Sequence, residues 1–221
     1  MLYKEFLEAT QENEEEYELP ELLYFGALER LEDVQKDLSK LEDIKHVRRV
    51  IRLFLISWGM MTRVVGRENL DWKRLGDTLR NLEKDFAALR SKSFLSANLF
   101  SDETTSNAVK KIYSELDPIP YLGSPTTISK ILHLLNPEIF LMWDNAIVNY
   151  YHKENRKINY SADGYLEFLK ENQETILSAL SEFGRDTGKP LSIIEKEIRI
   201  RHHNRTMAKI IDEYNWMIAH R

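Results

Sequence analysis

The chain of 221 residues contains no cysteine. This absence excludes disulfides, thiolate metal sites, iron–sulfur clusters and cysteine nucleophiles. Long apolar runs are missing as well: the longest, from Leu53 to Met61, is about nine residues and includes Ser57 and Gly59, too short to cross a bilayer. The first residues, with Lys4 and Glu5 before an acidic stretch, differ from a secretory signal peptide. These absences predict a soluble cytoplasmic protein without a membrane partner.

An excess of basic residues is also absent, because the net charge is −5. The charge is unevenly distributed, however. Residues 1–43 form an acidic N-terminal segment with 14 Asp and Glu against four Lys and Arg, whereas residues 44–221 carry 22 acids against 27 bases. The larger part is therefore mildly basic, which is typical either of a surface that contacts phosphates or of ordinary solvated helix faces.

The spacing of apolar residues predicts helices throughout and no strands. Apolar side chains recur every three or four residues after Pro20, from Ile44 to Val65 and from Leu75 to Leu89. Residues 91–105 are polar and predict a loop. Ser192 and Glu195 have capping-box spacing, which predicts one long final helical region as far as Ile218. We therefore expect an all-α, multi-helix orthogonal bundle of about eight or nine helices, as a single domain over 1–221 or as two lobes.

The segment from Ile119 to Tyr151 carries the most information about function. Ser124 and Pro125 are typical of the start of a helix, and Pro137 should end that helix after about Leu135. Asp144 follows as a lone carboxylate among apolar residues, at the expected start of another helix. An acid in such surroundings can be tuned for catalysis, and a turn that exposes backbone N–H groups can hold a phosphate.

This order of elements resembles the helix-hairpin-helix DNA glycosylase superfamily, the endonuclease III-like enzymes. Their signature is a Leu-Pro-Gly-Val-Gly hairpin, a following Thr-Ala helix, and a loop that ends in an Asp. The run from Ile119 to Gly123 is similar to the hairpin, Thr126-Thr127 to the start of the helix, and Trp143-Asp144-Asn145 to the segment that holds the catalytic Asp. The likeness places a helix-hairpin-helix element at about 106–135 and extends with the Asp loop over 106–151. The same residues also resemble uncharacterised glycosylase-like helical proteins.

The resemblance implies duplex DNA as the partner, a role in DNA repair, and Asp144 as the catalytic carboxylate. The lysine that forms a Schiff base in bifunctional members would lie at about Ser124 to Thr126, where no lysine stands. We therefore expect a monofunctional N-glycosylase that leaves an abasic site without cutting the strand. Tyr121 stands in place of the first hairpin glycine, which a tight turn would favour.

Each of these residues also has a plainer interpretation. Asp144 can serve only as a helix N-cap, worth typically about 1 kcal/mol. Gly123, Ser124 and Thr126, with Leu122 beside them, can bind a nucleic-acid phosphate through backbone and hydroxyl donors, or they can form an ordinary turn. Lys130 can reach a phosphate or remain solvated, and Tyr121 can wedge into a duplex or pack on its own domain. The alternative function is a non-catalytic helical binding module, or a regulatory domain that binds a protein partner or forms a homo-oligomer.

A basic strip near the C-terminal end is a further candidate contact with nucleic acid. It contains Arg199, Arg201 and Arg205, with His202 and His203 between them. Adjacent histidines point to different faces of a helix, so they lack the i, i+4 spacing of a zinc site. The sequence predicts no metal site and no cofactor.

Overall fold

The computed structural model describes residues 3–7, 18–41, 44–57, 71–119, 122 and 124–220. Within these residues the chain is helical and has no strands, so the all-α prediction is confirmed. A short helical turn at 3–7 precedes the labelled elements. These are α2 (Glu18–Lys36), η1 (Leu38–Lys40), α3 (Ile44–Ser57), α4 (Trp72–Asn81), α5 (Glu83–Ala87), α6 (Glu103–Leu116), α7 (Pro125–Leu135), α8 (Asn145–Glu154), α9 (Ala162–Thr187), α10 (Leu191–Arg201) and α11 (Met207–His220).

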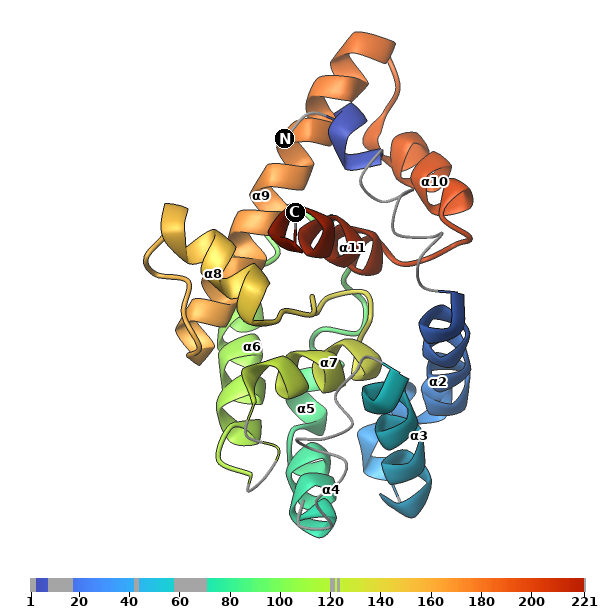
Figure 1. Ribbon diagram of the computed structural model, residues 1–221, viewed down its shortest axis with the longest axis vertical. Coiled ribbons are helices and arrows are strands. Elements are labelled where there is room, and N and C mark those ends of the chain that lie inside the picture. The colour runs from blue at the N-terminus through green and yellow to red at the C-terminus, as the bar shows by residue number, and fades with distance from the viewer. Residues whose placement is uncertain are drawn as a thin grey trace.

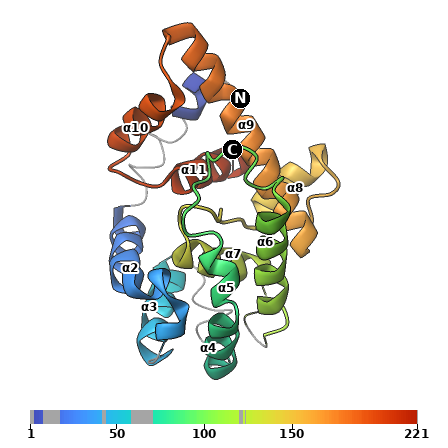
Figure 2. The ribbon, with the colours of Figure 1, turned by 180° about the vertical axis from the view of Figure 1, so that it is seen from behind.

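The helices form an elongated bundle in which α7 occupies the middle (Figure 1). Helices α2 and α3 lie side by side along one edge, and α6 with α8 and α9 lies along the opposite edge. The view from behind shows the same arrangement (Figure 2). Helix α7 crosses α5 and α6 at a large angle. The loop that connects α7 to α8 lies between α7 and α11.

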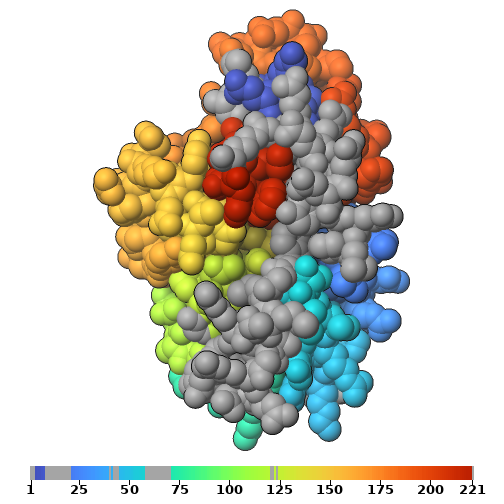
Figure 3. Space-filling model, in the orientation of Figure 1, coloured from blue at the N-terminus to red at the C-terminus, as the bar shows by residue number. Residues whose placement is uncertain are grey.

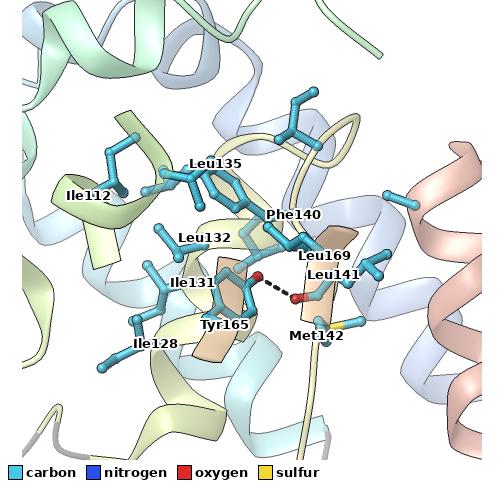
Figure 4. Close-up of a cluster of buried hydrophobic side chains, with 14 of the residues drawn as sticks. Ile112, Ile128, Ile131, Leu132, Leu135, Phe140, Leu141, Met142, Tyr165 and Leu169 are labelled. Carbon is cyan, nitrogen blue, oxygen red and sulfur yellow. Dashed lines mark hydrogen bonds between the residues drawn. The ribbon is translucent and has the colours of Figure 1, made fainter. Parts of the chain in front are cut away.

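The core gathers where α6, α7 and α9 meet the α7–α8 loop. In Figure 4, Ile112 from α6 and Ile128 from α7 point toward Tyr165 from α9, and the loop adds Phe140. The hydroxyl of Tyr165 donates a hydrogen bond of 2.6 Å to the backbone oxygen of Leu141. This bond satisfies a polar atom in an apolar setting and fixes the loop that leads to Asp144.

Local signals for the start and end of helices are confirmed around this loop. Asn136, before Pro137, is the C-cap of α7 and has non-helical angles (φ −150°, ψ 83°). Asp144 is the N-cap of α8, and Ser161 is the N-cap of α9, where its Oγ accepts from Gly164 N at 3.0 Å. Each of these helix ends depends on residues that lie within three or four positions of one another in the sequence.

Three other expectations need correction. The single final helical region is wrong: α10 and α11 are separate, and His203 and Asn204 between them adopt left-handed angles (φ 53° and 60°). Helix α10 begins after Pro190 without a side-chain cap, so Ser192 forms no capping box. The 75–89 stripe is split into α4 and α5 at Leu82.

The polar segment 91–105 is also more ordered than expected. Phe94 and Phe100 are buried there and meet edge to face, with ring centroids 5.4 Å apart. Helix α6 begins within this segment, at Glu103, because Asp102 caps it by accepting from Thr105 N at 2.9 Å. The residues after Ser57 in the predicted 44–65 helix lie outside the described residues. Among the described helices, none is both long enough and apolar enough to span a membrane.

Candidate active site

Asp144 combines a structural role with partial exposure to solvent. It adopts an extended conformation (φ −134°, ψ −174°) at the start of α8, and its Oδ1 accepts a hydrogen bond of 2.9 Å from Ile147 N. The side chain is 31% exposed. The N-terminal end of α8 adds favourable backbone dipoles for a negative charge at this position. Asp144 is therefore a fixed carboxylate that solvent can reach.

The backbone before Asp144 is held by α7. Trp143 is buried, its backbone N donates to Ser129 Oγ at 3.1 Å, and its indole Nε1 donates to Pro125 O at 3.1 Å. The Ser129 hydroxyl in turn donates to Thr126 O at 3.0 Å. The Trp143 ring packs edge-on against Tyr165 at 4.8 Å and Tyr160 at 6.0 Å. These contacts set the position of Asp144 from the first turn of α7.

His220 lies against the second oxygen of Asp144. Its Nε2 is 3.3 Å from Asp144 Oδ2, and its Nδ1 is 2.9 Å from the backbone oxygen of Trp216. The imidazole also stacks on the Trp216 ring at 4.5 Å. Both ring nitrogens of His220 therefore face oxygen atoms. Figure 3 shows α11 reaching the surface beside the α8 region, where this contact occurs.

Two buried ionisable groups lie behind Asp144. Asp212 on α11 is only 4% exposed, and burial raises its pKa to about 8, with further increases from the carboxylates of Glu213 and Asp144. The ammonium groups of Lys209 and Lys130 oppose this shift. Burial lowers the pKa of Lys130 on α7, against the opposing charges of Asp212 and Asp144. At neutral pH the site therefore holds a protonated carboxyl group at Asp212 close to the Asp144 carboxylate.

Several buried polar atoms around this site have no hydrogen-bond partner among the described residues. They are Thr127 Oγ1 on α7 and Asp212 Oδ1 and Asn215 Nδ2 on α11. The amide oxygen of Asn215 is satisfied, because it accepts from the Tyr151 hydroxyl at 2.6 Å. Buried polar groups are normally paired. Tyr113 Oη on α6 and Asn136 Nδ2 at the end of α7 also lack a partner among the described residues, so such atoms are not confined to the junction of α7, α8 and α11.

A second set of buried charges is fully paired and has a structural role. Lys209 Nζ lies 2.7 Å from Glu213 Oε1 and 3.0 Å from Glu21 Oε1. Arg205 lies 3.0 Å from Glu21 Oε2 and 3.5 Å from Glu213 Oε2. Two acids and two bases thus link α2 to α11. Burial and the Lys209 charge act in opposite directions on the pKa of Glu213, and burial prevails, so the pKa is raised.

The structure separates the residues expected to bind nucleic acid. Tyr121 and Gly123 lie outside the described residues. Leu122 is fully buried. Lys130 is buried as well, whereas the sequence predicted that its side chain would either be solvated or contact a phosphate. Ser124 and Thr126 are half-buried at the start of α7, where Ser124 is the N-cap without a side-chain hydrogen bond.

The basic strip is largely neutralised by neighbouring acids. Arg199 lies 2.8 Å from Glu138 and 3.3 Å from Glu195. Arg205 is buried in the network with Glu21. Arg201 is exposed. Among the three arginines of the expected strip, Arg201 is therefore the one that is exposed and has no ion pair among the described residues.

Sequence reasoning missed Asp212 and His220. Asp212 and Glu213 interrupt the apolar stripe of α11 directly after Ile210 and Ile211, and an acid at an otherwise buried position was the available signal. Nothing local links His220 to Asp144, which is 76 positions earlier in the chain.

The described residues contain no group of three or more His, Asp or Glu side chains placed to hold a metal ion. In comparisons with known proteins, no family model, no curated protein and no solved structure matches this chain.

Proposed function

We propose that this chain binds nucleic acid and removes a base hydrolytically, with Asp144 as the catalytic carboxylate. In such a reaction the carboxylate orients or deprotonates water and stabilises the sugar as positive charge develops on it. A proton must also reach the departing base. Asp212 is the carboxyl group of the site that keeps its proton at neutral pH, because burial raises its pKa to about 8, and we propose it as the source of that proton.

The observation that carries the proposal is the presence of two carboxyl groups in contrasting surroundings, the partly exposed Asp144 and the buried Asp212. Asp144 is 31% exposed, and its Oδ1 accepts a hydrogen bond from Ile147 N. Asp212 is buried behind it and keeps its proton. Two carboxyl groups whose surroundings separate their protonation states are the arrangement that glycosidic hydrolysis uses for a carboxylate and an acid.

The surface near Asp144 has the chemistry that a nucleic acid needs. Tyr150 and Tyr160 are exposed, and Tyr160 lies close enough to Asp144 for the carboxylate to add to the rise that burial causes in its pKa. Lys153, Arg156 and Lys157 are exposed at the end of α8 and in the loop that follows. Aromatic rings stack on bases and basic side chains contact phosphates, so this face supports a nucleic-acid substrate.

The test uses the full chain with fluorescent duplexes, each carrying one damaged or mismatched base, followed by alkali to cut at abasic sites. Asp144→Asn is the decisive variant, because Asn caps a helix about as well as Asp but has no negative charge. We expect base release by the wild-type protein and none by Asp144→Asn. The matched control is Asp71→Asn at the start of α4, where the carboxylate accepts from Arg74 N at 2.9 Å.

Base release that persists in Asp144→Asn would refute the mechanism. Asp212→Asn should lower the rate by about 100-fold or more, the usual contribution of a general acid. Release without strand cleavage is the expected product pattern, because no lysine stands at the turn before α7.

A non-catalytic binding module is the second candidate, and one observation favours it. Both oxygens of Asp144 already have partners within the chain, Ile147 N and His220 Nε2. A carboxylate used in this way needs no substrate to explain it. Salt-sensitive duplex binding without base release on any substrate would support this candidate.

A further inference from the structure

A groove lies between α2 and α3. These two helices lie at the edge of the molecule away from α6 and α8 (Figure 1). With the open space at its mouth it holds about 360 Å³. A Cβ atom at Gly26 would meet nothing within 4 Å, so the glycine leaves the floor of the groove open. The lining is otherwise mainly apolar, with one arginine: Leu22, Leu23, Ala27, Arg30, Val50 and Leu53.

Large apolar side chains remain in water along this groove. Leu22 is 65% exposed, Leu53 on the facing helix is 55% exposed, and Phe25 one turn after Leu22 is 38% exposed. Single exposed leucines are ordinary on a surface, but Leu22 and Leu53 line the same groove from adjacent helices, and Phe25 lies on the same helix as Leu22. They mark a surface that another apolar face can cover.

The other end of the groove is basic. Arg30 lies eight residues after Leu22, which is about 12 Å along the helix. His46 on α3 contacts the backbone oxygen of Arg30 at 3.2 Å, and Arg49 is exposed on the following turn. Helix α3 contains no acidic residue, and within the described chain no carboxylate pairs with Arg30 or Arg49. The occupant that fits is a helix with apolar side chains followed, about two turns later, by acids.

Helix α2 itself has this pattern. After Leu22 and Phe25 it carries exposed acids at Glu29 and Asp33, seven and eight residues further along. A third acid, Glu32, is already paired with Lys36 at 2.6 Å. The surface that contains the groove therefore also contains α2, a helix with the sequence pattern that fits the groove.

We propose that two copies of this chain associate through this face, with α2 of each copy in the α2–α3 groove of the other. A two-fold axis parallel to the helices brings the apolar ends together and places Glu29 of one copy against Arg49 of its partner, twice. Such an interface is self-complementary, as closed dimers require. A helix of the same chemistry from another protein is the competing occupant, and the experiment below distinguishes the two.

The experiment is sedimentation equilibrium of the full chain, combined with charge reversal in trans. The wild-type protein should form a dimer that weakens in high salt. Glu29→Arg alone and Arg49→Glu alone should each be monomeric, because two pairs of like charges then face each other. An equimolar mixture of the two variants should dimerise again, since every pair in the mixed dimer is opposite in sign.

Matched substitutions test the apolar part of the interface. Leu53→Glu should abolish the dimer, and Gly26→Arg should do so by filling the floor of the groove. Ile200→Glu on α10, where the native side chain is 60% exposed, is the control and should leave the dimer intact. Circular dichroism checks that each variant folds.

Three results would overturn the proposal. One is a wild-type protein that remains monomeric at about 0.1 mM, where a dimer with a micromolar Kd would be formed. Another is a dimer that persists in Leu53→Glu, and the third is a mixture of charge variants that stays monomeric. None of the substituted residues belongs to the candidate active site, so this proposal can fail or succeed independently of base release.

Discussion

Replacing Asp212 with Asn should make the protein more stable at neutral pH, which is unusual for a change in the core. Asp212 lies 4% exposed on α11, and its Oδ1 has no hydrogen-bond partner among the described residues. Burial raises its pKa from 3.8 to about 8, so above that value the folded protein must hold an unfavourable buried charge. Asn has nearly the same volume and never carries that charge.

The size of the effect follows from proton linkage. The folded state binds the Asp212 proton more tightly than the unfolded state, so stability from this group is complete below about pH 4 and is lost as the pH rises to about 8. Each pH unit in this window costs about 1.4 kcal/mol. At pH 7 the accumulated cost is about 4 kcal/mol, as an upper bound because neighbouring charges titrate with it.

The assay is urea unfolding at pH 5, 6, 7 and 8 for the wild-type protein and Asp212→Asn. The difference in free energy of unfolding should grow in favour of Asp212→Asn as the pH rises. The control is Asp186→Asn, an exposed acid near the end of α9, which should follow the wild-type curve. Parallel curves for the wild-type protein and Asp212→Asn would refute the reasoning, because Asp212 would then have the same pKa in the folded and unfolded states.

Three further predictions concern individual side chains. Lys209→Met should lower the free energy of unfolding by about 3–5 kcal/mol in urea titrations, since Glu21 and Glu213 would keep buried charges with only Arg205 to pair them; an unchanged midpoint would contradict this. Burial lowers the pKa of His133 to about 3, so the NMR signals of its imidazole should not titrate between about pH 5 and 8. The stability that the neutral, buried imidazole contributes should be lost only as the pH falls from 6.5 toward 3. Asp144→Ala should cost about 1 kcal/mol through the lost cap, whereas Asp144→Asn should cost only a few tenths, and equal losses would mean that charge rather than capping stabilises α8.

The elements that the sequence predicts correctly are those fixed by neighbouring residues. Asn136 and Pro137 end α7, and Asp144 and Ser161 cap α8 and α9, because each signal acts within about one helical turn. The same reasoning fails between α10 and α11. There the local pattern is still helical, but Arg205 turns inward to reach Glu21, which lies 184 positions earlier. This ion pair joins the residues just after the break to α2, a long-range contact that no local sequence pattern records.

The candidate site also contains residues that can be identified from the local sequence and residues that cannot. Asp144 can be identified from the sequence because a lone acid precedes an apolar helix. Asp212 and His220 cannot, since they come from α11 and lie near Asp144 only in the folded chain. The helix-hairpin-helix resemblance stays a prediction: α6 and α7 are present, but the turn residues Tyr121 and Gly123 between them lie outside the described chain.

The burial of Asp212 is the main reason to propose a function for the junction of α7, α8 and α11. The buried charges of Glu21, Arg205, Lys209 and Glu213 show that this fold can pair ionisable groups fully when they serve stability. At the junction three buried polar atoms have no partner in the described chain, and one belongs to an acid whose burial destabilises the folded state. Arrangements that reduce stability without a structural benefit are characteristic of sites whose partners come from outside the chain. If Asp144 were only a helix cap, nothing in its role would require Lys130 and Asp212 to be buried behind it.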